Sequence, residues 1–159
     1  MINKNGYPTL DQIKSKFPEP KALVKPKAII ECYTEIPCNP CSTSCPFDAI
    51  TIGEDINKIP EIDFDVCTGC GMCVYSCPGL AIMVANIKED RAYYKIPYEL
   101  IPVPVTGEIW KGVNRKGEII CEAKIENVMQ NKNTDRTILL TVSTPIEFLY
   151  DFITIRCTL

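Results

Sequence analysis

The sequence predicts an α+β protein, in which a cysteine-rich domain built as two pseudo-twofold β-loop-α-β halves precedes a small antiparallel β module. Three observations predict this arrangement. Eight of the ten cysteines fall between residues 32 and 77. A repeat offset by about 32 positions runs through that stretch, so that CPFDAITI at 45–52 aligns with CPGLAIMV at 77–84. Beyond residue 92, cysteine becomes sparse and β-branched residues dominate between turn signals.

We expect three parts along the chain: an N-terminal arm at 1–27, the cysteine-rich domain at 28–92 and the β module at 93–159. The arm is rich in lysine and proline. Thr9 and Gln12 have the spacing of a capping box, which predicts a short helix from Leu10 to Phe17 that Pro18 ends.

The two halves of the cysteine-rich domain are expected to contain the same elements. A strand at 28–31 leads into the first cysteine block, and a hairpin around 53–60 returns the chain through 62–64 to the second. Pro46 and Pro78 suit the first turn of a helix, where a missing N–H costs nothing. Each helix should pass into a strand, at 50–52 and 82–84.

The β module is expected to begin after a proline-rich connector at 97–104. Its predicted strands lie at 107–114, 117–129 and 136–144, with a turn at 131–135, and the segment 146–156 is left open as helix or strand. Some residues of the module are assigned to its core: Cys121, Cys157, Trp110, Tyr93, Tyr94 and Tyr98.

The second cysteine block has the spacing C-x2-C-x2-C-x3-C-P, with Cys67, Cys70, Cys73 and Cys77 followed by proline. This is the ligand signature of bacterial-type ferredoxins with [4Fe-4S] clusters, in which the fourth cysteine ligates the other cluster. The first block repeats its last three cysteines at Cys38, Cys41 and Cys45. Crossing the repeats groups Cys45 with Cys67, Cys70 and Cys73, and Cys77 with Cys38, Cys41 and one further ligand.

That further ligand is not given by the repeat. Glu35 stands at the repeat position, and Cys32 lies three residues earlier. Either Cys32 ligates in a C-x5-C variant, or it packs in the core and leaves one cluster with three thiolates. Ligation by Cys32 is preferred because no histidine is available to substitute. Gly69 and Gly71 are expected to allow unusual φ angles and a close approach of the backbone, so that amide N–H groups can point at the sulfur atoms.

Composition excludes several classes of function. The absence of histidine removes Rieske ligation, Ser-His and Cys-His catalytic pairs and the usual zinc-enzyme site. The formal charge of −3, with no basic run, argues against a nucleic-acid partner. No apolar stretch is long enough for a membrane span, and no signal peptide opens the chain. Because exposed cubane clusters are sensitive to oxygen, a reducing cytoplasm and an anaerobic or thermophilic setting are expected. C-x2-C spacing also favours metal ligation over disulfides.

Residues 32–83 resemble the dicluster bacterial ferredoxins. The longer segments AIIECYTEIPCNPCSTSCPFDAI (28–50) and DRTILLTVSTPIEF (135–148) are similar to the small two-domain iron–sulfur subunits found with FAD-dependent amine and imino-acid dehydrogenases. Those companions are relatives of the sarcosine oxidase alpha subunit and of proline or hydroxyproline dehydrogenases. The resemblance implies two [4Fe-4S] clusters, Cys32 as the remaining ligand, and a hetero-oligomer in which electrons from a flavin pass through this chain.

Two other functions stay open. A freely diffusing ferredoxin that serves several reductases fits the acidic balance, which suits electrostatic docking to basic partners. A redox-sensing regulator is the third, with no nucleic-acid surface to support it. Catalysis by this chain alone is not expected, because four cysteines per cluster leave no open iron position and no acid–base constellation stands nearby.

Overall fold

The computed structural model describes residues 2, 4–130, 132 and 136–157, which form a mixed structure dominated by antiparallel sheet. The main sheet contains these strands: β1 (Lys27–Ile30), β4 (Ile82–Lys88), β5 (Arg91–Tyr98), β6 (Ile109–Val113), β7 (Ile119–Gln130), β8 (Ile138–Pro145) and β9 (Thr154–Arg156). Their spatial order is β1-β4-β5-β8-β7-β6-β9, and neighbouring strands run antiparallel throughout.

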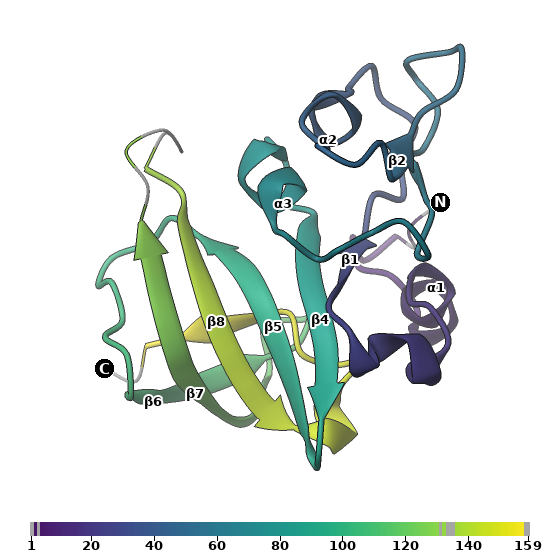
Figure 1. The fold of residues 1–159 in the computed structure, drawn as a ribbon. Coiled ribbons are helices and arrows are strands. Elements are labelled where there is room, and N and C mark those ends of the chain that lie inside the picture. Colours follow the sequence, from purple (N-terminus) through teal and green to yellow (C-terminus); the bar gives the residue numbers. More distant parts are fainter. Residues whose placement is uncertain (1, 3, 131, 133–135, 158–159) are drawn as a thin grey trace.

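The sheet curls because β7 pairs with different neighbours along its length. Its first half pairs with β6 and its second half with β8, with a register shift between Ile125 and Asn127. Such an irregularity bends a strand and increases its twist. Figure 1 shows β6 and β9 crossing behind the strands β5, β8 and β7. The main core fills the curl, where the rings of Tyr94 and Phe152 lie 4.5 Å apart.

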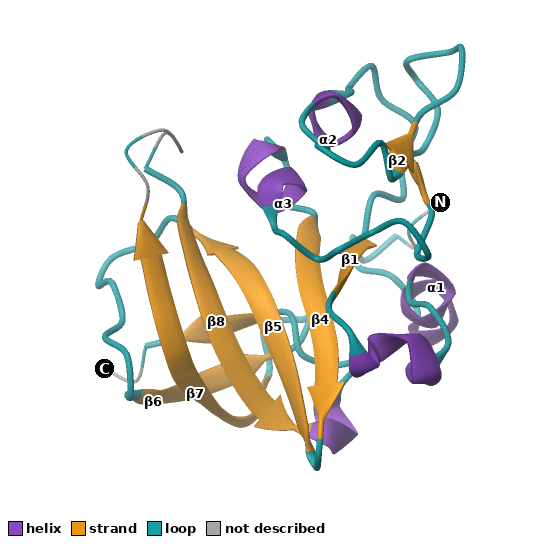
Figure 2. Ribbon diagram, in the orientation of Figure 1, coloured by secondary structure: helices purple, strands orange, loops and turns teal. Residues whose placement is uncertain are grey.

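Residues 28–30 of β1 and 82–85 of β4 are buried on both faces of the sheet, which explains why these stretches are apolar without a break. Ile29 and Met83 belong to the main core, whereas Ile30 and Val84 belong to a second core that also contains buried cysteines. The cysteine-rich segment therefore packs against one face of this part of the sheet, as Figure 2 shows for α3 beside the upper ends of the strands.

The N-terminal arm confirms the predicted capping box. Helix α1 (Leu10–Lys16) begins after Thr9, whose side chain and that of Gln12 bond each other's backbone amides. A 3₁₀ helix η1 (Pro20–Val24) follows. Ile13 and Leu23 from these elements are buried in the main core, so the arm is part of the folded body.

The predicted helices at Pro46 and Pro78 are wrong. The short helices α2 (Pro40–Thr43) and α3 (Met72–Ser76) precede these prolines and carry cysteines themselves. Each proline instead occupies the second position of a tight turn, closed by the amides of Asp48 and Leu80 onto the carbonyls of Cys45 and Cys77. Proline presets the φ of that turn position. Only a few residues then remain before the next strand, too few for another helix.

The strands around the cysteine blocks pair crosswise. The strand before the first block, β1, pairs with β4 after the second, and β3 (Glu61–Ile62), before the second block, pairs with β2 (Ile50–Thr51), after the first. The repeat extends to individual hydrogen bonds. The amide of Glu31 donates to the carbonyl of Ala81 at 2.8 Å, and the amide of Asp63, at the equivalent position, donates to the carbonyl of Ala49 at 2.8 Å. The strands that flank one cysteine block therefore pair with those that flank the other in both halves.

The predicted strands of the β module correspond to β6, β7 and β8. The segment 146–156, for which the sequence left helix and strand undecided, contains a 3₁₀ helix η2 (Ile146–Phe148) and then β9. The expected turn at 131–135 lies outside the described residues apart from residue 132. Strand β5 was not foreseen, since Pro97 suggested a connector; Pro97 lies beyond the last β4 pairing at Lys95. The proposed domain boundary between 92 and 93 falls inside β5, so both parts share one sheet.

A buried ion pair ties the β6–β7 turn to the end of β1. The guanidinium of Arg115 binds both carboxylate oxygens of Glu31, with the side chains only 8% and 9% exposed. Arg115 also donates to the carbonyls of Tyr150 and Asp151, and the Tyr33 hydroxyl donates to Glu31. Because these charges are removed from water, breaking the pair from one side leaves an uncompensated charge.

We expect Arg115→Met to lower the melting temperature by about 6–12 °C, the equivalent of losing about 3 kcal/mol in a domain of this size. The double variant Arg115→Met, Glu31→Leu should recover most of that loss, because neither charge is then left alone. Circular dichroism under anaerobic conditions measures both. Lys111→Met, at the exposed Lys111–Glu122 pair, is the control and should change stability by less than about 1 kcal/mol. If the double variant lost as much stability as Arg115→Met and Glu31→Leu lose together when each is made alone, this account of the pair would be contradicted.

Candidate functional site

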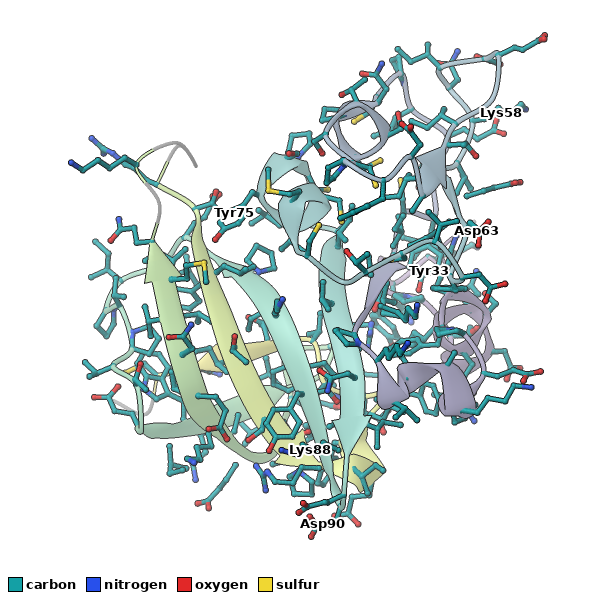
Figure 3. The ribbon with its side chains drawn as sticks, in the orientation of Figure 1. Tyr33, Lys58, Asp63, Tyr75, Lys88 and Asp90 are labelled. Carbon is teal, nitrogen blue, oxygen red and sulfur yellow. The ribbon has the colours of Figure 1, made fainter. Side chains whose placement is uncertain are left out.

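The cysteine-rich segment contains two cavities, each lined by four cysteines. Site 1 is an open cavity of about 550 Å³, a volume that includes its solvent mouth, lined by Cys32, Cys38, Cys41 and Cys77. Site 2 is a smaller cavity of about 310 Å³, lined by Cys45, Cys67, Cys70 and Cys73. The structure thus brings together the two groups that the crossed repeats define, and Cys32 joins the group of Cys38, Cys41 and Cys77. In Figure 3 most of the sulfur atoms gather around α2 and α3.

Repeated local geometry positions the cysteine that each half contributes to the other. Cys41 lies on α2 and Cys73 on α3, and Cys45 and Cys77 come directly after these helices. The amide of Ala49 donates to the Cys45 sulfur at 3.4 Å, and that of Ala81 donates to the Cys77 sulfur at 3.3 Å. Hydrogen bonds of this kind orient sulfur ligands and stabilise negative charge on them.

The loop of site 2 depends on glycine. Gly69 has φ +68°, and a Cβ there would lie 2.6 Å from the Pro26 backbone. Gly71 has φ +91° and stands at the N-cap of α3. The expectation that these glycines allow unusual backbone geometry is confirmed. A bulkier residue at 69 would push the loop away from the strand that follows Pro26.

Two lysines that the sequence did not single out hold this loop. The Lys27 ammonium donates to the carbonyls of Phe64 and Cys67 at 2.5 and 2.8 Å, and the Lys95 ammonium donates to the carbonyl of Gly69 at 3.0 Å. Lys27 is 8% exposed. The one available signal was the position of Lys27 at the start of an apolar strand, where a lysine needs a partner.

Cys32 lies on the wall of site 1, while Glu35 does not. Glu35, at the position that the repeat assigns to a ligand, is exposed and pairs with Lys58 at 3.0 Å. Figure 3 shows Lys58 on the loop beyond β2. The Cys32 thiol donates weakly to the carbonyl of Thr34 at 3.8 Å. Cys32 is thus the cysteine of this stretch that reaches the site 1 cavity.

Three of the site thiols, Cys32 and Cys41 in site 1 and Cys73 in site 2, resist ionisation in the free protein. Burial raises the pKa of Cys73 to about 12, and repulsion from Cys67, Cys70 and Cys45 contributes to this rise. Burial also raises the pKa of Cys32 and of Cys41, with Cys77 as a further cause in each. Metal ligation requires thiolates, so positive charge inside these cavities must compensate for the lost protons.

The donor set fits a polynuclear iron–sulfur group. Among the described residues, no three histidine, cysteine or acidic side chains converge closely enough to hold a single metal ion. The cysteines instead surround a space, four to each cavity, as a compact cluster with thiolate corners requires.

In the part of the chain that the structure describes, no helix is both long and apolar enough to cross a bilayer.

Comparison with known proteins identifies this segment. Residues 36–81 match the model of the 4Fe-4S dicluster domain. One subunit of the Na(+)-translocating ferredoxin:NAD(+) oxidoreductase complex of Acetobacterium woodii is 55% identical over 38 residues, 24% of this chain and 11% of that protein. The ferredoxin-type protein NapF of Haemophilus influenzae is 35% identical over 66 residues, 39% of this chain and 38% of its own length.

Pyruvate synthase subunit PorD of Methanothermobacter marburgensis is 40% identical over 53 residues, covering 33% of this chain and 58% of that subunit. The chain therefore spans between about a tenth and three fifths of the length of these relatives. No solved structure matches the chain. The matched segment is a 4Fe-4S dicluster domain of ferredoxin type, an electron-transfer unit, and the chain holds two [4Fe-4S] clusters.

The cysteines of the β module pack against the main core, as predicted. Cys121 and Cys157 are partly buried there, and burial raises the pKa of Cys121 to about 11. Trp110, Tyr94 and Tyr98 are likewise buried, and Tyr93 is half-buried.

Alkylation of Cys121 by iodoacetamide should stay slow at pH 8–9 in the folded protein, a range around the ordinary thiol pKa of about 8.5 in which the denatured chain reacts. The rate should rise as the pH passes about 11. Because folding raises the pKa of this thiol, its contribution to stability is fully present at pH values below the pKa in the unfolded chain. The contribution is lost as the pH rises through the pKa in the folded protein. Mass spectrometry of the Cys121 peptide measures the rate. Equal rates in folded and denatured protein at pH 8–9 would contradict the burial argument.

Cys32→Ser should lower bound iron from about eight atoms per chain towards four, or convert one cluster to a three-iron form with its own electron paramagnetic resonance signal. The reason is the loss of one of the four thiols around site 1. Cys121→Ser is the matched control and should keep full iron. Iron content and spectra that are unchanged in Cys32→Ser would remove Cys32 from the ligand set.

Proposed function

We propose that this chain, built around its 4Fe-4S dicluster domain, relays electrons as the iron–sulfur subunit of a multi-subunit FAD-dependent amine or imino-acid dehydrogenase. The observation that carries the proposal is the pairing of two four-cysteine cavities in one chain, which gives two adjacent redox positions. Two of the relatives, by their names, are subunits of redox complexes. The flavin partner comes from the resemblance of segments 28–50 and 135–148.

The ligand sets belong to this proposal. Site 1 would use Cys32, Cys38, Cys41 and Cys77, and site 2 would use Cys45, Cys67, Cys70 and Cys73. When bound, each cluster supplies a one-electron redox centre. The chain's own residues orient the thiols, donate amide hydrogen bonds to sulfur, and exclude water through the apolar core beneath the sites.

An exposed apolar loop offers a contact for the partner subunit. Between β5 and β6, the apolar side chains of Leu100, Ile101, Val103 and Val105 all face solvent, with Ile101 92% exposed and Val105 63% exposed. A cluster of large apolar side chains on one surface loop is typical of protein interfaces. We assign this loop to contact with the FAD-containing dehydrogenase subunit.

The experiment is anaerobic purification of the native protein from its own host at low salt, followed by sizing and flavin analysis of what travels with it. Association with an FAD-containing dehydrogenase supports the proposal and reveals the substrate. A lone species of about 18 kDa with roughly eight irons would instead support the freely diffusing ferredoxin.

The double variant Leu100→Asp, Ile101→Asp should weaken association by about tenfold or more, the effect of losing ~1.4 kcal/mol, while iron content stays at the wild-type level. Val24→Asp, a comparably exposed apolar position on η1, is the control and should co-purify normally. Point substitutions are preferred to truncation, because removing the β module would take β8 away from β5. Undiminished co-purification of the double variant would rule out this loop as the contact.

A further inference from the structure

Sites 1 and 2 follow the same repeat, yet their surroundings differ in one hydrogen bond. The amide of Ala28 donates to the sulfur of Cys67 in site 2 at 3.4 Å. The repeat offset of 32 positions places Pro60 at the equivalent position beside site 1, and Pro60 lines that cavity. Proline has no N–H, so site 1 lacks this bond.

The two sites also differ in charge. The ammonium groups of Lys27 and Lys95 lie against the site 2 loop, bonded to neutral carbonyls. Among the described residues, neither ammonium has a carboxylate within ion-pair distance. Lys27 is nearly buried, so solvent screens its charge weakly.

Beside site 1, two ion pairs neutralise the charges of Lys58 and Glu31, whereas Lys16 has no ion pair among the described residues. Lys58, which lines the cavity, is paired with Glu35 at 3.0 Å, and Glu31, next to Cys32, is paired with Arg115. Lys16 acts on Cys32 from α1, where its ammonium lies over the ring of Tyr33 at 5.4 Å.

Acidic groups near site 2 are more exposed than its lysines. Asp63 and Asp65 precede the site 2 loop, and both are exposed to solvent. The Asp63 carboxylate accepts the amides of Asp65 and Val66 at 2.9 and 3.4 Å. Figure 3 shows Asp63 at the outer side of this loop. Their charges are therefore better screened than that of Lys27.

We propose that site 2 is reduced before site 1, because Lys27, Lys95 and the Ala28 amide stabilise the negative charge that an added electron brings. The inference rests on the ligand sets proposed above. Adding one electron, from dithionite in the test below, raises the negative charge at a site by one unit. Nearby positive charge and N–H···S bonds favour that change and so raise the reduction potential. An electron entering the chain therefore settles at site 2, close to the exposed Cys70.

The test is a dithionite titration of the isolated full chain, followed by electron paramagnetic resonance, which needs no partner protein. The variant Cys32→Ser shows which electron paramagnetic resonance signal belongs to which site, because it alters site 1 alone. If that variant does not accumulate as folded protein, Cys70→Ser makes the same assignment by altering site 2. The centre that Cys32→Ser leaves unchanged should be reduced first in the wild type. Reduction of the other centre first overturns the proposal. If Cys32→Ser and Cys70→Ser each kept both clusters unchanged, the proposed ligand sets would be wrong instead.

The charge argument is tested by Lys95→Gln, with wild-type iron content and melting temperature as the check on folding. Its site 2 reduction equilibrium should fall about tenfold, equivalent to about 59 mV for one electron, while site 1 changes less. Lys95→Arg keeps the charge and should restore the value. Lys88→Gln removes one charge at the far end of β4, labelled in Figure 3, and should have no effect.

A second variant adds charge instead of removing it. Ile36→Lys places an ammonium at the exposed rim of site 1, without touching the packing of site 2. The site 1 potential should rise and the gap between the sites should narrow. Unchanged potentials in both Lys95→Gln and Ile36→Lys would overturn the electrostatic cause.

Discussion

The crossed pairing of β1 with β4 and of β3 with β2 is the constraint on which both sites depend. Each cysteine block supplies three neighbouring cysteines to one cavity and its last cysteine to the other. A single loop cannot surround a compact cluster, so the fourth thiol must come from a segment remote in sequence. The paired strands hold the two blocks at that separation. Short elements suffice here because the clusters replace much of the core that such small halves lack.

The symmetry of the repeat is broken in the places that bear on redox behaviour. By the repeat, Pro60 corresponds to Ala28 and Glu35 corresponds to Cys67, and Cys32, three residues before Glu35, is the cysteine that lines site 1. The cavity of site 1 is the larger of the two, while in site 2 Gly69 packs against Pro26 and two lysines hold the loop. Two nearly equivalent centres thereby acquire different surroundings, which is what a directed relay of electrons needs.

The β module is joined to the dicluster domain by its backbone and its core. Strand β5 pairs with β4 on one side and with β8 on the other, so the sheet has no seam at the expected boundary. Arg115 reaches from the β6–β7 turn to Glu31, the residue before Cys32. The module therefore holds the residue next to Cys32 in place, in addition to presenting the exposed loop of Leu100 and Ile101.

The sequence alone determined the grouping of the cysteines, the capping of α1 and the strands β6 to β8, because ligand spacing, capping boxes and alternating patterns are local signals. The structure brings the predicted cysteine groups around two cavities, and ligation by each stays a prediction. The helices were misplaced because proline suits a turn as well as a helix start. Strand β5 was missed because its Pro97 suggested a connector, whereas Pro97 lies beyond the last residue of β5 that pairs with β4, Lys95. The contacts of Lys27 with Cys67 and of Arg115 with Glu31 join residues 40 and 84 positions apart. Only the tertiary structure decided them, since no local pattern specifies which distant carbonyl or carboxylate a buried charge will meet.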